Sequence, residues 1–186
     1  SEFGASWRER PQFAVTYPGA RLTGQAPMGK TLIATGTSGT GRPAAWVGWA
    51  STSYVWRKTP ASLPRGVEPL AVVAGRDAGL MVGQRSAGTT ALLRSIDAWT
   101  WEPTDGPPGL DPLAERTAWA GSPTWIVADT VGSDGAHDLR ASVDGLDWAA
   151  LPATGLPTDG AVPLLAIATD TVVALTPAGI WARPIG

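Results

Sequence analysis

The sequence has no cysteine, a single histidine and few charged residues, and each of these shortages excludes a class of site. Its 186 residues include no Cys, one His and 16% charged residues, with a net charge of −2. Without cysteine there is no disulfide framework and no thiolate metal site, and we expect neither a metal nor another cofactor. Basic residues are scattered along the chain, which argues against nucleic acid as a partner. No apolar run approaches the ~18 residues that a membrane span requires.

Turn-forming residues and tryptophan, in contrast, are abundant. The chain contains 23 Gly, 17 Pro and 10 Trp, but two Tyr and two Phe, and 44% of its residues are apolar. Such frequent Gly and Pro are typical of short strands joined by many turns, and no stretch keeps a helical period over about ten residues. Ser1-Glu2-Phe3 resembles the remnant of a cloning site. Residues 4–186 are therefore expected to form a single all-β domain.

A Ser-x-Asp-Gly-x-x-Trp motif recurs along the chain at a nearly constant interval. The complete copy consists of Ser142, Asp144, Gly145 and Trp148. A second copy consists of Ser95, Asp97 and Trp101, with Ala98 in the place of the glycine. Degenerate copies end at Trp56 and Trp7, so that the four tryptophans lie 45–49 residues apart. This spacing predicts four repeats of one structural unit.

Each unit also contains short apolar runs in a constant order, separated by Gly, Pro, Asp and Ser turns. One run lies 24 or 25 residues after each motif tryptophan, a second lies about ten residues earlier, and a third precedes the motif. The runs predicted as innermost strands are residues 70–74, 117–120 and 164–168, with a weaker one near Leu22. A unit of about 45 residues with four strands is a blade of a β-propeller. The chain is therefore predicted to be a four-bladed propeller.

The two ends of the chain suggest how the ring closes. The last unit lacks a fourth strand, while Trp7 lies in what the repeat spacing makes a spare fourth strand. Pairing of this N-terminal strand with the last blade would leave no exposed sheet edge. Alternatively, four blades form half of a larger ring that a second chain completes. The expected state is a monomer or a ring-completing dimer.

The motif resembles the Asp-box, or BNR repeat, of sialidase-like β-propellers. The resemblance implies that it lies on the turn between the third and fourth strands of a blade, away from the face that binds ligands. An Asp carboxylate there can accept hydrogen bonds from the backbone amides of its own turn, and the Ser hydroxyl can add another. Gly145 permits a positive φ, and Trp148 can fold back over the turn. We therefore predict a structural role for Asp97 and Asp144.

The same resemblance raises the question of glycoside hydrolysis. The sialidase family uses three clustered arginines, a tyrosine nucleophile paired with a glutamate, and a further acid/base. This chain has only Tyr17 and Tyr54, neither of them near an acid in a recognisable setting. The predicted inner strands are almost free of charged residues. No catalytic residue is predicted.

A complete phosphate-loop pattern, G-x-x-x-x-G-K-[ST], is present from Gly24 to Thr31. Phosphate binding by this pattern requires a preceding strand and a following helix, so that backbone amides converge on the ligand. The residues after Thr31 include Gly36, Gly39 and Pro43, which are incompatible with a helix. The repeat spacing instead places residues 28–30 in a turn.

His137 lies in a segment with several acids, residues 129–138, which could suggest a cation site. The segment lacks the ligand order of a calcium-binding helix–loop–helix motif, and a single histidine cannot support a multi-histidine centre. The repeat places it in a hairpin between the second and third strands. We expect a solvated turn.

Four tryptophans outside the motif, Trp46, Trp49, Trp99 and Trp119, are candidates for ligand contact, with packing between blades as the alternative. Taken with the missing catalytic groups, they favour a non-catalytic recognition or scaffold module of a larger, extracytoplasmic or secreted protein, which binds a protein or carbohydrate partner. The alternatives are a sialidase-like glycoside hydrolase and a factor in the assembly of a protein complex. The motif does not distinguish them, because one fold carries many functions.

Overall fold

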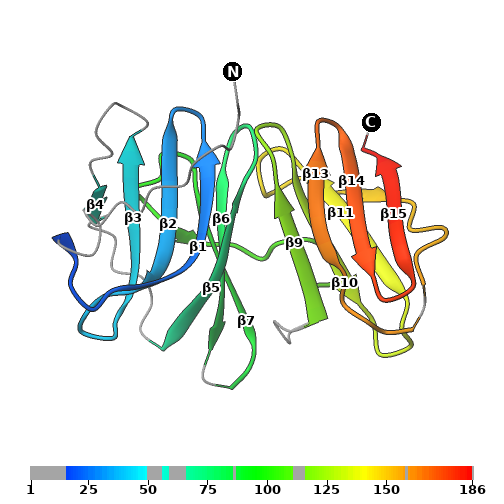
Figure 1. Cartoon of the computed structure of the whole chain (residues 1–186), viewed down its shortest axis with the longest axis horizontal. Coiled ribbons are helices and arrows are strands. Elements are labelled where there is room, and N and C mark those ends of the chain that lie inside the picture. The colour runs from blue at the N-terminus through cyan, green and yellow to red at the C-terminus, as the bar shows by residue number, and fades with distance from the viewer. Residues whose placement is uncertain are drawn as a thin grey trace, which may run out of the picture.

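The structure is a computed structural model that describes residues 16–49, 56–58, 66–85, 87–110, 116–157 and 159–185. These residues form fifteen strands in four sheets, which stand side by side along the molecule (Figure 1). The prediction of an all-β chain built from four units of short strands is confirmed.

Each sheet is an antiparallel meander of consecutive strands. The first sheet consists of β1 (Arg21–Met28), β2 (Thr31–Thr37), β3 (Pro43–Trp49) and β4 (Trp56–Lys58). The second consists of β5 (Val67–Ala74), β6 (Gly79–Arg85), β7 (Thr90–Ser95) and β8 (Glu102–Pro103). The third consists of β9 (Thr117–Gly121), β10 (Ile126–Val131), β11 (His137–Ser142) and β12 (Ala149–Leu151). The fourth consists of β13 (Leu164–Ala168), β14 (Thr171–Thr176) and β15 (Gly179–Pro184).

The strands lie at the positions that the sequence repeat predicts. The apolar runs predicted as innermost strands lie in β1, β5, β9 and β13. Trp56 begins β4, and Trp101 and Trp148 directly precede β8 and β12. Each described motif therefore lies between the third and fourth strands of its sheet.

Apolar side chains fill the spaces between successive sheets. One cluster joins the first and second sheets through Ile33 and Met81, the next joins the second and third through Leu80 and Ile126, and the last joins the third and fourth through Val127 and Val172. Leu80 and Met81 are consecutive on β6, and successive side chains of a strand point to opposite faces. The second sheet is therefore buried on both faces, as is the third through Ile126 and Val127.

Two glycines allow the inner strands to approach one another closely. A Cβ on Gly24 of β1 would lie 2.7 Å from the backbone nitrogen of Val72 on β5. A Cβ on Gly121 of β9 would lie 2.7 Å from both the backbone nitrogen and the oxygen of Ala74. Glycine is required at such contacts because any side chain would collide with backbone.

The phosphate-loop match forms a strand, a turn and a strand. Gly24 belongs to β1, Gly29 and Lys30 form the turn, and the Thr31 hydroxyl donates to the carbonyl of Met28 at 2.7 Å. β2 follows directly, so the helix N-terminus that phosphate binding requires is not present at this place.

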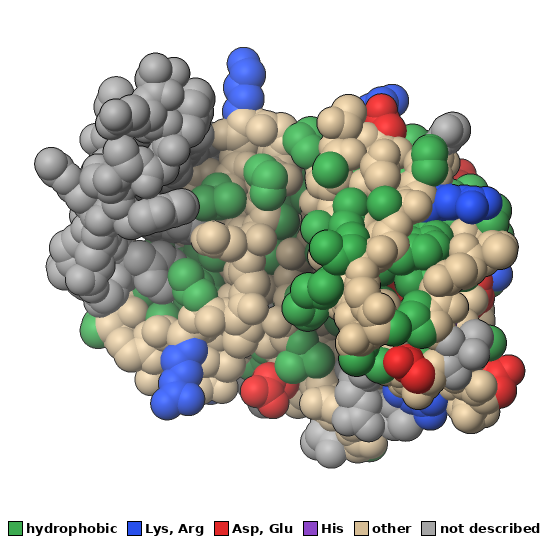
Figure 2. All heavy atoms as spheres, turned by 45° about the vertical axis from the view of Figure 1, so that its right-hand side comes forward, with side chains coloured by type: hydrophobic (Ala, Val, Ile, Leu, Met, Phe, Trp, Pro, Cys, Tyr) green, Lys and Arg blue, Asp and Glu red, His purple; other side chains and the backbone are tan. Residues whose placement is uncertain are grey.

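In the described residues the four sheets do not close a ring. The fourth sheet has three strands, and its face away from the third sheet is exposed, with hydrophobic side chains gathered on this side of the molecule (Figure 2). The segment predicted to close the ring, around Trp7, lies outside the described residues, and that closure stays a prediction.

Candidate functional site

The turn after β7 is closed by the carboxylate of Asp97. Its Oδ1 accepts hydrogen bonds from the backbone amides of Trp99 and Thr100, both at 2.7 Å, and from the Ser95 hydroxyl at 3.1 Å. The Thr100 hydroxyl donates to Oδ2 at 3.1 Å. One side chain thus satisfies the amides that the tight turn leaves without backbone partners.

The turn after β11 repeats this arrangement around Asp144. Its Oδ1 accepts from the amides of Leu146 at 2.9 Å and Asp147 at 3.1 Å, and from the Ser142 hydroxyl at 3.0 Å. The amide of Gly145 donates to the Ser142 hydroxyl at 2.8 Å. The two motif copies therefore share one hydrogen-bonding pattern.

The Asp144 turn also fastens the third sheet to the second. Arg94 of β7 donates from Nε to the Asp144 carbonyl at 2.6 Å, and the amide of Asp77 donates to the Val143 carbonyl at 3.1 Å. These bonds engage carbonyl groups that point out of the turn. The motif therefore positions one blade against another as well as closing its own hairpin.

The residue after each motif aspartate adopts a left-handed conformation. Gly145 has φ +77°, and Ala98, which takes its place in the other copy, has φ +66°. The Ala98 side chain is buried in the cluster between the first and second sheets. A Cβ on Gly145 would lie 3.0 Å from Cδ2 of Leu80, so the third sheet has less room at this position than the second.

The hydrogen bonds shift the ionisation of both motif carboxylates. Burial raises the pKa of Asp97, but hydrogen bonds from Thr100, Trp99 and Ser95 outweigh it and lower the pKa below its ordinary value. Burial also raises the pKa of Asp144. The hydrogen bonds from Leu146, Asp147 and Ser142 and the charge of Arg94 outweigh it, so that the pKa is again lower than its ordinary value. Both groups therefore stay ionised to a lower pH than an ordinary aspartate does.

Acid titration tests this arrangement. A carboxylate whose pKa falls on folding stabilises the folded state above its unfolded pKa of about 3.9, and this stabilisation is lost as the pH falls through the lower folded value. We expect the wild type to lose more unfolding free energy between about pH 6 and pH 3 than the double variant Asp97→Asn, Asp144→Asn, as measured by urea denaturation. The remaining carboxylates titrate in both proteins, so their contributions cancel when the two losses of unfolding free energy are compared. Equal losses would show that folding does not lower these two pKa values.

The motif tryptophans pack between sheets. Trp101 is buried in the cluster of the first and second sheets, beside Ala98 of its own turn. Trp148 is half-buried between the second and third sheets and meets Trp119 edge-on, with ring centroids 6.2 Å apart. The sequence predicts that Trp148 folds back over its own turn; in the structure Trp101 and Trp148 both pack in clusters that join neighbouring sheets. Trp7 lies outside the described residues, as does the side chain of Trp56.

The three candidate tryptophans whose side chains are described, Trp46, Trp99 and Trp119, belong to three different clusters. Trp46 is fully buried on the far face of the first sheet, among Ala34, Ala44 and Tyr17, so it does not form an exposed platform. Trp99 is half-buried against the cluster of the first and second sheets. The side chain of Trp49 lies outside the described residues. Trp119 lines a cavity.

That cavity lies among the four inner strands. It has a volume of about 340 Å³, and residues 25–27, 72–73, 119–121 and 165–167 line it, one segment from each sheet. Apart from Gln25 and the Trp119 indole nitrogen, the side chains of this lining are apolar. The cavity offers no charged group to a ligand.

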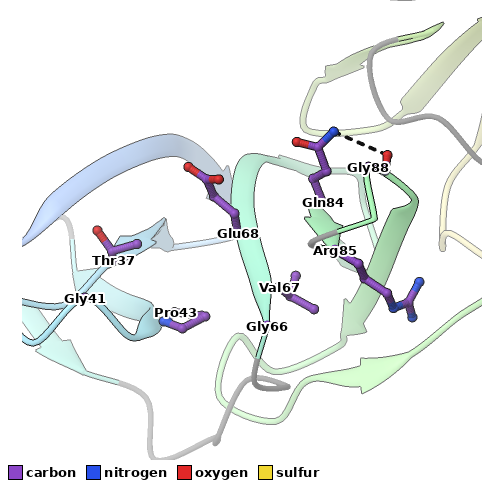
Figure 3. Close-up of a pocket in the computed structure, with 9 residues that line it drawn as sticks. All are labelled: Thr37, Gly41, Pro43, Gly66, Val67, Glu68, Gln84, Arg85 and Gly88. Carbon is purple, nitrogen blue, oxygen red and sulfur yellow. Dashed lines mark hydrogen bonds between the residues drawn. The ribbon is translucent and has the colours of Figure 1, made fainter.

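A second pocket, of about 580 Å³, lies between the first and second sheets (Figure 3). The first sheet contributes Thr37, Gly41 and Pro43, and the second contributes residues 66–68, Gln84, Arg85 and Gly88. This volume is within the usual range for small-molecule sites, about 300–1,000 Å³. Its polar lining makes it the stronger of the two candidate sites.

Glu68 and Gln84 are two polar residues of the lining of this inter-sheet pocket. They are directly opposite each other on β5 and β6, which places their side chains on the same face of the sheet. Gln84 donates from Nε2 to the Gly88 carbonyl at 3.3 Å, and this bond orients the amide (Figure 3). Arg85 extends away from Glu68 and donates from Nη1 to the Thr90 carbonyl at 2.6 Å.

This pair is not evident in the sequence, because the apolar run that predicts the inner strand covers only residues 70–74, whereas β5 extends from Val67 to Ala74. Pro69, a poor strand residue, separates that run from Glu68. A bulge between Pro69 and Ala71 accommodates the proline. The expectation of inner strands almost free of charge is corrected accordingly: β5 carries Glu68, and β1 carries Arg21.

His137 is not in a solvated turn, which corrects the expectation from sequence. Its Nδ1 lies 2.6 Å from Oδ2 of Asp129, its Nε2 lies 2.8 Å from the carbonyl oxygen of Pro157, and the side chains of both His137 and Asp129 are buried. Burial raises the pKa of Asp129 against the hydrogen bond and charge of His137. The pair ties β10 and β11 to the connection leading to the fourth sheet.

The described residues contain neither a cluster of metal-ligating side chains nor a helix that could span a membrane. No three His, Cys, Asp or Glu side chains gather there as metal ligands would. No helix in this part of the chain has the length and apolar character needed to cross a bilayer.

Comparison with known proteins finds similarity in structure alone. No family model matches the chain, and no curated protein matches it. A triple arginine-to-alanine mutant of AofleA from Arthrobotrys oligospora is similar over 98% of this chain and 59% of its own, with a TM-score of 0.59 and 14% identity. YjhT is similar over 85% of this chain and 58% of its own, with a TM-score of 0.50 and 12% identity.

A sialidase from Trypanosoma rangeli, in complex with the inhibitor DANA, covers 82% of this chain and 28% of its own at 10% identity, with a TM-score of 0.49. At such identities the likeness to AofleA and YjhT concerns the fold, which is all-β and propeller-like. The chain spans less than two thirds of the length of each of these proteins.

Proposed function

We propose that this chain is a non-catalytic recognition module that binds a carbohydrate in the inter-sheet pocket. The observation that carries the proposal is an open pocket of about 580 Å³ whose lining includes Glu68 and Gln84, register partners on β5 and β6. Thr37 adds a hydroxyl from the neighbouring sheet. The three groups come from two sheets, so the packing of the sheets sets the shape of the site.

The chemistry of these groups suits a polyhydroxylated ligand. A carboxylate offers two acceptor oxygens, and a carboxamide offers a donor and an acceptor in one plane, so each can engage two neighbouring hydroxyls. The half-buried ring of Pro43 and the buried Val67 supply apolar surface for C–H groups of a sugar ring. The bond from Gln84 to Gly88 holds its amide in place before the ligand arrives, which lowers the entropic cost of binding.

The lining of the two described cavities supports binding over hydrolysis. Glycoside hydrolysis by paired carboxylates requires two acids, about 5–10 Å apart. Glu68 is the single carboxylate among the described lining residues of the inter-sheet pocket, and the described lining of the central cavity has none. A binding role uses one carboxylate as an acceptor and requires no proton transfer.

We also propose that the Asp97 and Asp144 turns are Asp-boxes in the structural sense. Their shared hydrogen bonds support this, as does their position between third and fourth strands. In this proposal the boxes hold the scaffold, and the ligand binds elsewhere.

Glycan binding tests the function. We expect labelled protein to bind members of a glycan array. Titration calorimetry with the best of them should show at least about 10-fold weaker binding for Glu68→Ala, which loses a hydrogen bond to a charged group of about 1.5 kcal/mol or more. Gln84→Ala loses a neutral hydrogen bond of about 0.5–1.5 kcal/mol and should bind about 2- to 10-fold more weakly. The control is Glu102→Ala, an exposed acid on β8 of the same sheet, which should leave binding unchanged.

Two results would contradict the proposal. One is a glycan that binds equally well to the wild type and to both pocket variants, because the site would then lie elsewhere. The other is turnover of chromogenic glycosides that survives repurification and is lost in Glu68→Gln, because the pocket would then be catalytic.

A further inference from the structure

The connection that follows β12, here called the linking segment (residues 152–157), contacts both the third and the fourth sheet. The Pro157 carbonyl oxygen lies 2.8 Å from Nε2 of His137, which belongs to β11 of the third sheet. The Thr154 carbonyl accepts a hydrogen bond at 3.1 Å from the indole nitrogen of Trp181, which belongs to β15 of the fourth sheet. Two backbone carbonyls of the linking segment therefore connect the two sheets.

The contact at Pro157 depends on a proton. A carbonyl oxygen is an acceptor, so Nε2 of His137 must carry hydrogen for a bond to form. The other ring nitrogen, Nδ1, lies 2.6 Å from Oδ2 of Asp129, and the two side chains are only 2% and 0% exposed. One imidazole thus lies between two acceptors. Both contacts are hydrogen bonds while the imidazole and the carboxyl group share two protons, and one of them is lost when a single proton remains.

The single remaining proton belongs on Nδ1 of His137. A hydrogen bond to a carboxylate is stronger than one to a neutral carbonyl. A bare Nδ1 would also place its lone pair 2.6 Å from the carboxylate of Asp129, whose other oxygen has no partner in the described residues. The deprotonated pair therefore keeps the bond to Asp129 and loses the bond to Pro157, where a bare Nε2 faces a carbonyl oxygen.

The charged groups near this pair have bonds of their own. They are Asp138 with Arg140 at 2.8 Å, Arg116 with two backbone carbonyls at the end of β10, and Asp134 with a backbone amide of its hairpin. The linking segment carries no charged side chain. Burial, together with the charge of Asp138, raises the pKa of Asp129 against the bond and charge of His137. Proton binding at this place is therefore a property of the coupled pair.

We propose that Asp129 and His137 form a pH-dependent latch, which binds the linking segment while the pair holds two protons and releases Pro157 when one of them leaves. An unfolded histidine is deprotonated above about pH 6.5, whereas the folded pair loses a hydrogen bond if it gives up the same proton. Stability from the latch is therefore fully present at about pH 6 and is lost as the pH rises through the range in which the folded pair deprotonates.

The latch acts on the junction between the third and fourth sheets. The inter-sheet pocket lies between the first and second sheets, and neither the pair nor the linking segment lines it. The latch therefore does not depend on the proposed glycan binding, and the two can fail separately.

Nuclear magnetic resonance tests the positions of the protons, because His137 is the only histidine and gives one pair of imidazole nitrogen signals. We expect both nitrogens to carry hydrogen at about pH 6, and Nε2 alone to lose it as the pH rises to about 9. In Asp129→Asn the side-chain amide can donate to Nδ1, so Nε2 should keep its hydrogen throughout. A wild type that keeps hydrogen on Nε2 over the whole range, or that loses it from Nδ1 instead, overturns the proposal.

Amide hydrogen exchange tests the release. The Leu156 amide donates to the Ala153 carbonyl at 3.0 Å inside the linking segment. We expect its protection factor in the wild type to fall at least about 10-fold between about pH 6 and pH 9, and to stay constant in Asp129→Asn. The control is the Gly88 amide, which makes the same kind of bond three residues back, to Arg85 in the second sheet, at 2.8 Å.

An equal fall in protection at Leu156 and Gly88 of the wild type contradicts the latch, as does an equal fall at Leu156 in the wild type and in Asp129→Asn. The comparison of the two amides within the wild type decides even if the variant does not fold.

Discussion

Replacing His137 with alanine is expected to lower the free energy of unfolding by about 3–5 kcal/mol, the usual cost of removing one partner of a buried ion pair. Asp129 is fully buried, and its Oδ1 has no hydrogen-bond partner in the described residues. His137 Nε2 faces the Pro157 carbonyl and must carry a proton, so the 2.6 Å contact with Asp129 holds a second proton between the two groups. Removal of the imidazole leaves the carboxyl group without this bond.

A double-mutant cycle separates the pair from the rest of the fold. Asp129→Ala, His137→Ala and the double variant are compared by urea denaturation at neutral pH. We expect the double variant to be more stable than the sum of the single effects predicts, by about 1–3 kcal/mol, because it leaves neither group buried without a partner. A cost below about 1 kcal/mol for His137→Ala would match an exposed turn and would contradict the buried pair.

Replacing Trp46 with alanine is expected to cost about 3–5 kcal/mol, as for other buried tryptophans. Its side chain is fully buried between the first sheet and residues 17 and 20. The cavity left by the indole would be lined by Ala34 and Ala44, which are too small to fill it. The same change also removes the ring contact with Tyr17, which anchors the segment preceding β1.

Trp99→Ala is the matched control. Trp99 is half-buried on an exposed turn, so its truncation exposes less apolar surface and should cost less than half as much. The urea denaturation midpoints of the two variants show which substitution costs more stability, and we expect the lower midpoint for Trp46→Ala. If Trp46→Ala reduced glycan binding with stability unchanged, Trp46 would be a ligand contact, and the burial described here would be wrong.

The positions of the strands could be read from the sequence because they follow from local rules. The repeat of Trp at 45–49 residues, the apolar runs between turns and the Asp-Gly or Asp-Ala turns all act over a few residues. At Asp97 and Asp144 the carboxylate bonds to amides two and three residues later, so the pattern is visible in seven consecutive letters. The same reasoning excluded a helix after the phosphate-loop match at Gly24.

The sites were harder to predict because their partners are distant in sequence. His137 bonds to residues 8 and 20 positions away, and nothing in the hairpin sequence indicates that the connection at Pro157 will cover it. Glu68 and Gln84 are register partners on β5 and β6, and Pro69 and the bulge beside it conceal in the sequence that β5 begins before residue 70. Trp46 and Trp119 have similar surroundings in the sequence, yet one is buried and the other lines a cavity.

The sequence by itself determined that this chain is all-β, that it consists of four repeated units, and where the turn aspartates lie, because hydrogen bonds within a turn and alternation within a strand involve near neighbours. The tertiary structure alone decided which faces are covered. It buried the His137 and Asp129 pair, joined Thr37 to Glu68 and Gln84 in one pocket, and left Leu164, Leu175 and Ile180 exposed. The physical reason is that burial depends on the sheet that packs next, and neighbouring sheets are contributed by residues tens of positions apart.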